Sequence, residues 1–364
     1  MSALEAAKGL ARAPRALGYA MPAEWAPHHA TWIAWPHNQA DWPGKFAPIP
    51  WVFAEIVRHL TRHERVGILV KDAAMQKAAA RVLAKVGADV GRVDFVRQVT
   101  DRIWTRDTGP SFVRDARGRL AAIDWGFNAW AKYDDWKNDV KVAGRIAQAA
   151  GAPTWQPRRP GPRGRADRFV LEGGAIDVDG EGTLLATEEC LLDKVQERNP
   201  GVGRAAQEAV LADALAIDKV IWLDRGIVGD DTHGHIDDLA RFVAPGRVVC
   251  CSEPDPVDPN HAICVENLAR LRSARDARGR KLDVIELPMP RPLSFAGQRI
   301  PASYANFYIG NGVVLVPTFN DASDRLALNL LAELFPGREV IGIHAVDLVW
   351  GLGTLHCMTQ QQPA

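Results

Sequence analysis

The sequence predicts a mixed α/β protein in which five strand–strand–helix–strand units form a ring around one central site. Four hairpin patterns recur along the chain at nearly constant spacing, and a helical pattern lies between successive hairpins. A fixed period of this size is typical of a repeat architecture. A single cysteine close to the C-terminus, entered through a glycine-rich turn, adds reactive chemistry to the last unit.

Each hairpin pattern is a short apolar strand, a tight polar turn and a second apolar strand. The starts, Ser111, Ala175, Ala240 and Ala305, are 64, 65 and 65 residues apart. The turns RDARG, DGEG, APGR and GNG contain glycine, which adopts the positive φ that tight hairpin turns require. We therefore expect glycine to provide a positive φ in all four turns.

Helical patterns are expected after the hairpins at 139–150, 202–216, 261–278 and 320–335, with Gly279 as the stop of the third. Strands are expected at 219–224 and 339–344. A degenerate first unit has a strand near Ala30, a helix at 53–63, a strand at 65–72 and a helix at 73–86. The Cys357 segment would supply the final strand and close the ring with the first unit. The alternative is an ordinary α/β sheet in which the spacing is accidental.

Composition indicates a soluble globular protein. The 364 residues include 44 basic and 44 acidic side chains, so no net charge favours nucleic acid or an acidic membrane surface. No apolar window reaches the roughly 18 residues of a membrane span. Five cysteines without repeated spacing indicate reduced thiols and a cytoplasmic location.

The first twenty residues are rich in alanine and arginine but lack the apolar core of a secretion signal. We expect residues 1–20 to form a flexible tail ahead of a single catalytic domain at 21–364. A start at Met21 or a transit peptide is the alternative interpretation of this segment.

Chemistry-bearing residues precede the hairpins at equivalent positions. Asp107, Glu172 and Asp237 lie four, three and three residues ahead of their hairpin starts, and His235 is two residues before Asp237. A symmetric ring would bring them, with Cys357, to one end of its central channel. Carboxylates bind a planar guanidinium through paired hydrogen bonds. The bound cation would also favour the Cys357 thiolate, and the histidine would move protons.

Six segments of the sequence resemble the signature segments of a known family. They are MPAEWAPHHATWIAWP, WTRDTGP, DWGFNAW, FVLEGGAIDVDGEGTLLATEECLL, THGHID and GLGTLHCMTQQQPA. The chain resembles the agmatine deiminase family from about Met21 to its C-terminus. That family is grouped with bacterial peptidylarginine deiminases in the guanidine-modifying superfamily. The resemblance implies the five-bladed α/β propeller (pentein) fold of that superfamily.

The resemblance also implies roles for individual residues. Cys357 matches the nucleophile and His235 the general acid/base. Asp107 and Glu172 match the carboxylates that grip the guanidinium, and Asp237 matches a further ligand to substrate or nucleophile. The aromatic wall of the substrate channel corresponds to Trp104.

The implied reaction converts agmatine and water to N-carbamoylputrescine and ammonia through a covalent thiouronium intermediate, a step of putrescine biosynthesis and polyamine metabolism. It needs neither a metal nor an organic cofactor. The expected partner is a small cationic guanidino substrate, with no nucleic acid and no membrane. The sequence is also compatible with a homodimer.

Some positions depart from the family pattern. Leu352 and Thr354 stand where glycine and asparagine are frequent, Asp177 where histidine is frequent, and His233 where aspartate is frequent. The five core residues, Asp107, Glu172, His235, Asp237 and Cys357, match the family. The departures bear on which substrate the protein uses. His356 is expected to be structural and to point away from Cys357.

Three other functions stay open at this point. A deiminase for free or peptidyl arginine would need a cation for the substrate carboxylate, such as Arg106 or the arginines within 158–165. Agmatine would instead meet an acidic mouth, for which the pair at 134–135 is the candidate. A metal-dependent hydrolase would use His233 and His235 as ligands. A catalytically silent binding module is the last alternative.

Overall fold

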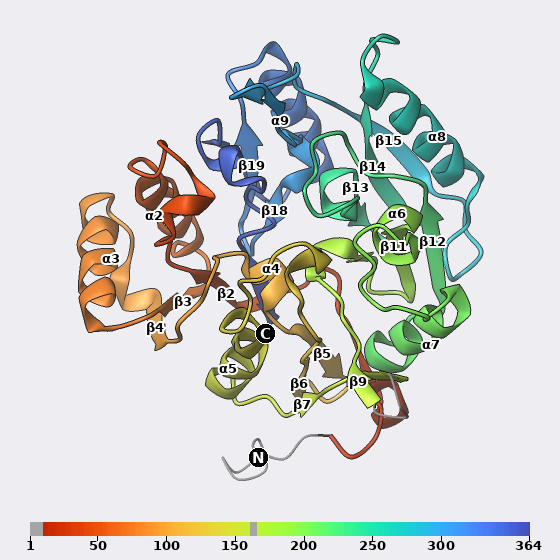
Figure 1. Cartoon of the computed structure of the whole chain (residues 1–364), viewed down its shortest axis with the longest axis horizontal. Helices are drawn as coiled ribbons and strands as arrows, with labels where there is room; N and C mark the ends of the chain where they lie inside the picture. The colour runs from red at the N-terminus through yellow and green to blue at the C-terminus, as the bar shows by residue number, and fades with distance from the viewer. Residues whose placement is uncertain (1–9, 161–165) are drawn as a thin grey trace.

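The computed structural model describes residues 10–160 and 166–364. Figure 1 shows strands gathered around the middle of the molecule, with the longer helices at the periphery. These helices are α2 (Ile49–Leu60), α3 (Ala73–Lys85), α5 (Val142–Ala149), α7 (Arg204–Leu215), α8 (Pro259–Ser273) and α9 (Ala322–Leu334). Short helices α4 (Thr105–Thr108) and α6 (Glu188–Leu192) lie nearer the centre. The fold is therefore mixed α/β, as the sequence predicts.

Five sheets of three or four strands occur in the described part of the chain, and each contains the same unit. Two strands pair antiparallel, and a third runs parallel to the second. Four units are β5 (Ser111–Asp115), β6 (Leu120–Ile123) and β7 (Thr154–Trp155); β10 (Asp177–Val178), β11 (Thr183–Thr187) and β12 (Lys219–Leu223); β13 (Ala240–Ala244), β14 (Arg247–Ser252) and β15 (Asp283–Pro288); and β18 (Tyr308–Ile309), β19 (Val313–Thr318) and β20 (Glu339–His344).

The fifth unit joins the two ends of the chain. Strand β21 (Gln360–Pro363) pairs antiparallel with β2 (His28–Ala34), which runs parallel to β3 (Arg65–Val70). An additional strand, β4 (Val93–Arg97), pairs with β3. The predicted pairing of the C-terminal strand with the first unit is confirmed, although the strand begins three residues after Cys357. The remaining pairs are β8 (Arg158–Pro160) with β9 (Ala166–Arg168) and β16 (Ser294–Phe295) with β17 (Gln298–Arg299).

One predicted helix end is wrong. The helix expected at 261–278 is α8, which ends at Ser273, because Ala274 has an extended backbone with ψ 161°. The segment after it forms a loop around Asp276, whose Oδ1 accepts hydrogen bonds from the backbone N–H groups of Arg278 and Arg280 at 2.9 and 2.8 Å. Gly279 has φ +79° within this loop and does not cap the helix.

Glycine has the expected positive φ in three of the four hairpin turns, at Gly118, Gly180, Gly182 and Gly246. The prediction is wrong for the fourth turn, where Gly310 and Gly312 do not have a positive φ. Close packing explains the glycine there: a Cβ on Gly312 would lie 2.2 Å from Nδ1 of His63.

The start of the described chain is packed rather than free. Strand β1 (Tyr19–Ala20) pairs antiparallel with β5, and Tyr19 is buried in the core beneath it. Arg15 donates from Nη1 to the carbonyl of Ile217 at 3.0 Å, just beyond α7. Residues 10–20 therefore differ from the flexible tail expected over 1–20, and residues 1–9 lie outside the described part. Helices in the described ranges are too short or too polar to cross a membrane.

Candidate active site

Each of the five units has a short turn directly before its first strand. Helix α4 precedes β5, and 3-10 turns at Gly173–Ala175, Ile236–Asp238 and Tyr304–Asn306 precede β10, β13 and β18. A turn at 355–358 precedes β21. The turns of consecutive units contact one another. They bring together side chains that are far apart in the sequence.

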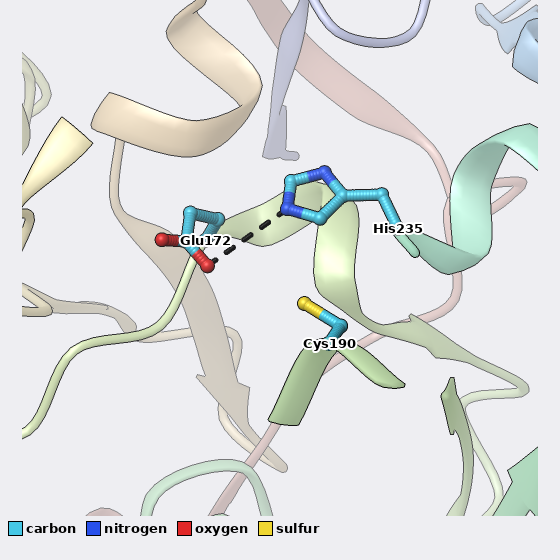
Figure 2. Close-up of side chains that lie close together, drawn as sticks. All are labelled: Glu172, Cys190 and His235. Atoms are coloured by element: carbon cyan, nitrogen blue, oxygen red, sulfur yellow. Dashed lines mark ion pairs between the residues drawn. The ribbon is translucent and has the colours of Figure 1, made fainter. Parts of the chain in front are cut away.

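His235 lies among the three predicted carboxylates. Its Nδ1 is 3.9 Å from Oδ1 of Asp107 and 3.9 Å from Oδ1 of Asp237, and its Nε2 is 3.8 Å from Oε2 of Glu172. All four side chains are buried. Figure 2 shows the side chains of Glu172 and Cys190 both directed toward the His235 ring. Cys190 was not singled out from the sequence, although it lies in the segment FVLEGGAIDVDGEGTLLATEECLL that carries part of the family resemblance.

Cys357 lies beside this cluster. Its Sγ is 3.7 Å from Oδ2 of Asp237 and accepts a hydrogen bond from Nδ2 of Asn306 at 3.1 Å. The Asn306 amide is oriented by Thr354, whose hydroxyl donates to Asn306 Oδ1 at 2.7 Å. Sequence reasoning missed Asn306. The repeat itself carried the signal, since Asn306 occupies the turn of the fourth unit.

Several buried polar atoms of the cluster have no hydrogen-bond partner among the described residues: Oε2 of Glu172, Oδ1 of Asp237 and both ring nitrogens of His235. Leaving such atoms unpaired costs about 1–3 kcal/mol each. A planar cation with several N–H donors would satisfy the carboxylate oxygens. The cluster is thus arranged to receive a guanidinium-like group.

The other carboxylate oxygens are held by the protein. Asp107 accepts from the backbone N–H of Gly174 at 3.0 Å and from Nε1 of Trp130 at 2.9 Å. Glu172 accepts from Nε of Arg198 at 3.2 Å. These bonds fix both side chains in place. Neither Trp130 nor Arg198 was predicted, because each lies in a loop whose path the hairpin repeat does not determine.

The electric field of the site keeps the thiol neutral. Burial raises the pKa of Cys357 well above its usual value, and Asp237 raises it further. Burial also raises the pKa of Asp107, to about 6. Burial raises the pKa of Glu172, but Arg198 and His235 outweigh it and lower that pKa to about 2.

His235 carries a proton in this environment. Burial lowers its pKa, but Asp107 and the other nearby acidic groups raise it by more, to well above the usual value. These shifts favour a protonated His235 and a neutral Cys357 thiol beside the carboxylates. A bound cation, in addition to protonated His235, would lower the pKa of Cys357 and so favour its thiolate.

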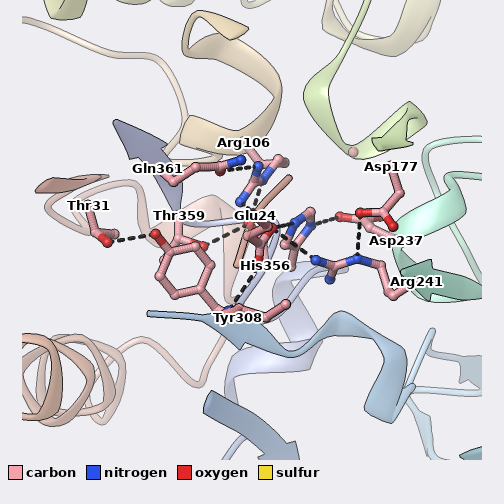
Figure 3. A network of polar contacts seen from close by, with 12 residues as sticks. Glu24, Thr31, Arg106, Asp177, Asp237, Arg241, Tyr308, His356, Thr359 and Gln361 are labelled. Atoms are coloured by element: carbon pink, nitrogen blue, oxygen red, sulfur yellow. Dashed lines mark hydrogen bonds and ion pairs between the residues drawn. The ribbon is translucent and has the colours of Figure 1, made fainter. Parts of the chain in front are cut away.

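A polar network lies behind Asp237 (Figure 3). His356 contacts Oδ2 of Asp237 through Nδ1 and Oε2 of Glu24 through Nε2, each at 2.7 Å. Arg241 donates to the same Glu24 oxygen at 2.9 Å. His356 holds the carboxylate that faces Cys357, a role that its position in the sequence did not reveal.

Arg106 belongs to the same network. It is buried and donates to Gln361 Oε1 at 2.7 Å, with Glu24 3.4 Å away. It is absent from the residues that line the cavity leading to Cys357. Arg106 is therefore not placed to bind a substrate carboxylate, contrary to the alternative that the sequence left open.

A cavity of about 290 Å³ reaches Cys357 and Asp107. Trp104 forms part of its wall and packs against Trp42, with ring centroids 5.8 Å apart. Asp135 lines the cavity as predicted for the acidic mouth, whereas Asp134 does not. Among the arginines of 158–165, the described ones, Arg158 and Arg159, do not line it either; residues 161–165 lie outside the described part.

Two groups of described residues have ligand atoms close enough for a metal ion: one is Glu172, Cys190 and His235, and the other is Asp237, Asp238 and Cys357. Neither includes His233, whose Nε2 lies 3.4 Å from Asp193. The His233–His235 ligand pair of the metal-hydrolase alternative is therefore not among these groups. Arg198, whose Nε lies 3.2 Å from Oε1 of Glu172, also disfavours a metal cation in the first group.

Comparisons with known proteins show the family of the chain. The chain matches the model of the Porphyromonas-type peptidyl-arginine deiminases over residues 20–363. It is 40% identical to an agmatine deiminase of Stutzerimonas stutzeri over 98% of both chains, and 39% identical to one of Pseudomonas aeruginosa over 96% of this chain and 97% of the other. The solved agmatine deiminase of Enterococcus faecalis has a TM-score of 0.89 and 33% identity, covering 98% of this chain and 99% of that one. The chain belongs to the Porphyromonas-type peptidyl-arginine deiminase family.

Proposed function

We propose that this protein hydrolyses agmatine to N-carbamoylputrescine and ammonia, with Cys357 as the nucleophile. The observation that carries the proposal is the cluster of unpartnered, buried carboxylate oxygens beside a cavity-lining thiol. Relatives named agmatine deiminase, about 40% identical over 98% of the chain, support the choice of substrate.

In the proposed complex the guanidinium donates hydrogen bonds to Glu172 Oε2, Asp237 Oδ1 and Asp107. The aliphatic chain of the substrate passes along Trp104. The positive charge offsets the carboxylates that hold the pKa of Cys357 high, so the thiol gives its proton to solvent and the thiolate forms when substrate is bound. Charge-assisted hydrogen bonds of this kind contribute about 1.5–3 kcal/mol each.

The reaction then proceeds in two displacements. The Sγ of Cys357 attacks the guanidinium carbon, and His235 gives a proton to the departing nitrogen, which leaves as ammonia. The product of this half-reaction is a thiouronium on Cys357. Water next attacks the same carbon and gives one proton to His235. As the C–S bond breaks, the remaining hydroxyl proton passes to the departing sulfur, which restores the Cys357 thiol and releases neutral N-carbamoylputrescine. His235 ends protonated, as it began.

The proposal extends to the architecture and location. We assign the five units to a five-bladed α/β propeller whose five turns surround the site, supported by the shared strand order of the five sheets. A cytoplasmic location is supported by five free cysteines, all buried.

Free or peptidyl arginine is the second candidate, and the cavity disfavours it. Among the described lining residues the basic side chain is Arg102, which already pairs with Asp41 and Asp135. Arg102 Nε has no partner among the described residues, but the two carboxylates beside this guanidinium leave an excess negative charge that would repel the carboxylate of arginine. A site built to bind a polar group discriminates by a large factor against an analogue that leaves buried polar groups without partners.

The test is ammonia release from agmatine, arginine and a blocked arginine peptide, measured side by side. We expect kcat/KM for agmatine to exceed that for the other two by at least about 100-fold. Comparable rates on arginine or the peptide would reject agmatine as the preferred substrate while leaving the thiol chemistry standing. No ammonia from any of the three would reject the deiminase function itself.

A further inference from the structure

Asp41 lines the cavity that leads to Cys357 and has one unpaired carboxylate oxygen. It ends the 3-10 turn Gln39–Asp41, and its side chain is 2% exposed. Oδ1 accepts hydrogen bonds from Nη1 of Arg102 at 2.9 Å and from Nδ2 of Asn38 at 3.3 Å. Oδ2 is buried and has no partner among the described residues. Such an oxygen is costly unless a donor arrives to satisfy it.

The other carboxylates of the cavity are already occupied. Asp135 accepts from Nη2 of Arg102 with both oxygens, at 3.0 and 3.3 Å. Asp231 pairs with Lys132 and accepts from the Tyr133 hydroxyl at 2.5 Å. Both oxygens of Asp107 accept hydrogen bonds at the Cys357 end. Asp41 is thus the cavity-lining carboxylate, within the described ranges, that retains an open acceptor.

The local charge favours a cation at this position. Asp41 and Asp135 share the single guanidinium of Arg102, which leaves the group with one excess negative charge. Burial raises the pKa of Asp41 to about 6, against the lowering effect of Arg102, and Asp135 raises it further. An added ammonium would stabilise the ionised form of Asp41, whereas a carboxylate would be repelled.

The same cavity is lined by Asp41, Trp104 and Cys357, so one extended substrate can contact all three. We propose that Asp41 binds the primary ammonium group of the substrate and thereby selects a guanidine with a cationic tail over one with a carboxylate. This inference rests on the proposed agmatine hydrolysis and adds the residue that recognises the far end of the substrate.

The experiment compares two substrates that differ in the tail alone. Agmatine and 1-butylguanidine share the guanidinium and the four-carbon chain, but 1-butylguanidine lacks the ammonium. Steady-state ammonia release is measured for the wild-type protein, Asp41→Asn and Asp41→Ser. Asp94→Asn is the matched control, because its side chain is 51% exposed, pairs with Arg65 and does not line the cavity.

We expect both Asp41 variants to lose about 10- to 100-fold in kcat/KM for agmatine, mostly through KM, the size of one charge-assisted hydrogen bond. Their activity on 1-butylguanidine should stay within about threefold of wild type, which also shows that they fold. Asp94→Asn should retain agmatine activity within about twofold.

Equal losses on both substrates would overturn the inference, since Asp41 would then act on the site only by supporting Arg102. Unchanged agmatine kinetics would overturn it as well. A wild-type protein that releases no ammonia from agmatine would instead reject the proposed function, so the two failures are distinguishable.

Discussion

The proposed mechanism depends on the sulfur atom of a single residue, Cys357. Cys357 is the cysteine that lines the cavity among the described residues, and its Sγ is held between Asn306 and Asp237. Cys357→Ser should lower kcat by at least about 1,000-fold, because a hydroxyl needs a strong base that the site does not offer. Cys264→Ser is the matched control: this thiol is buried on α8 against Met289 and should tolerate the change. Wild-type turnover by Cys357→Ser would sink the covalent mechanism.

The acid limb of the pH profile is a second residue-scale prediction. Asp107 must be ionised to bind a cation, and its pKa is raised by burial to about 6. We therefore expect kcat/KM to fall as the pH drops through about 6, because protonation removes an acceptor from the free enzyme. Trp130 donates to ionised Asp107, so Trp130→Phe should raise that pKa and move the limb to higher pH. If the acid limb does not move in this variant, a group other than Asp107 is responsible for it.

At the element scale, the turns that precede the first strands must pass very close to one another. A Cβ on Gly174 would lie 2.5 Å from Nδ1 of His235 and 2.9 Å from Oδ1 of Asp107. Gly174→Ala should therefore displace both side chains and reduce kcat/KM by at least about 100-fold, since small misplacements cost this much. Gly203→Ala, where a Cβ meets no heavy atom within 4 Å, should leave the kinetics unchanged. A normal rate for Gly174→Ala would mean that the turn is not the constraint we describe.

The elements also show where prediction from the sequence succeeds. The 65-residue spacing predicts the order of strands and helices in each unit. Hairpin turns and helical periodicity are local signals, so they can be recognised in the sequence. The spacing also predicts that Asp107, Glu172 and Asp237 converge. It does not predict the end of α8, which depends on hydrogen bonds around Asp276. Nor does it reveal that His356 supports Asp237, since that contact joins residues 119 positions apart.

In the whole molecule, β21 is not the only strand near a chain end that pairs with a distant part of the sequence. The segment ahead of Met21 contributes β1, and Tyr19 is 5% exposed within the core that covers β5 and α7. Tyr19→Ala should lower the free energy of unfolding by about 3 kcal/mol. Tyr19→Phe keeps the ring and should cost much less. Thermal unfolding of the full chain measures both, and equal midpoints for the wild type and Tyr19→Ala would show that β1 is dispensable.

The central claim is that Cys357 forms a covalent bond to the carbon of a guanidinium substrate. Its most direct test is mass spectrometry of the protein mixed with agmatine and quenched in acid during turnover. The account predicts an adduct with the mass of agmatine minus ammonia, confined to the peptide that contains Cys357 and absent from Cys357→Ser. Sustained ammonia release from agmatine with Cys357 unmodified, or with the adduct on another residue, would contradict it.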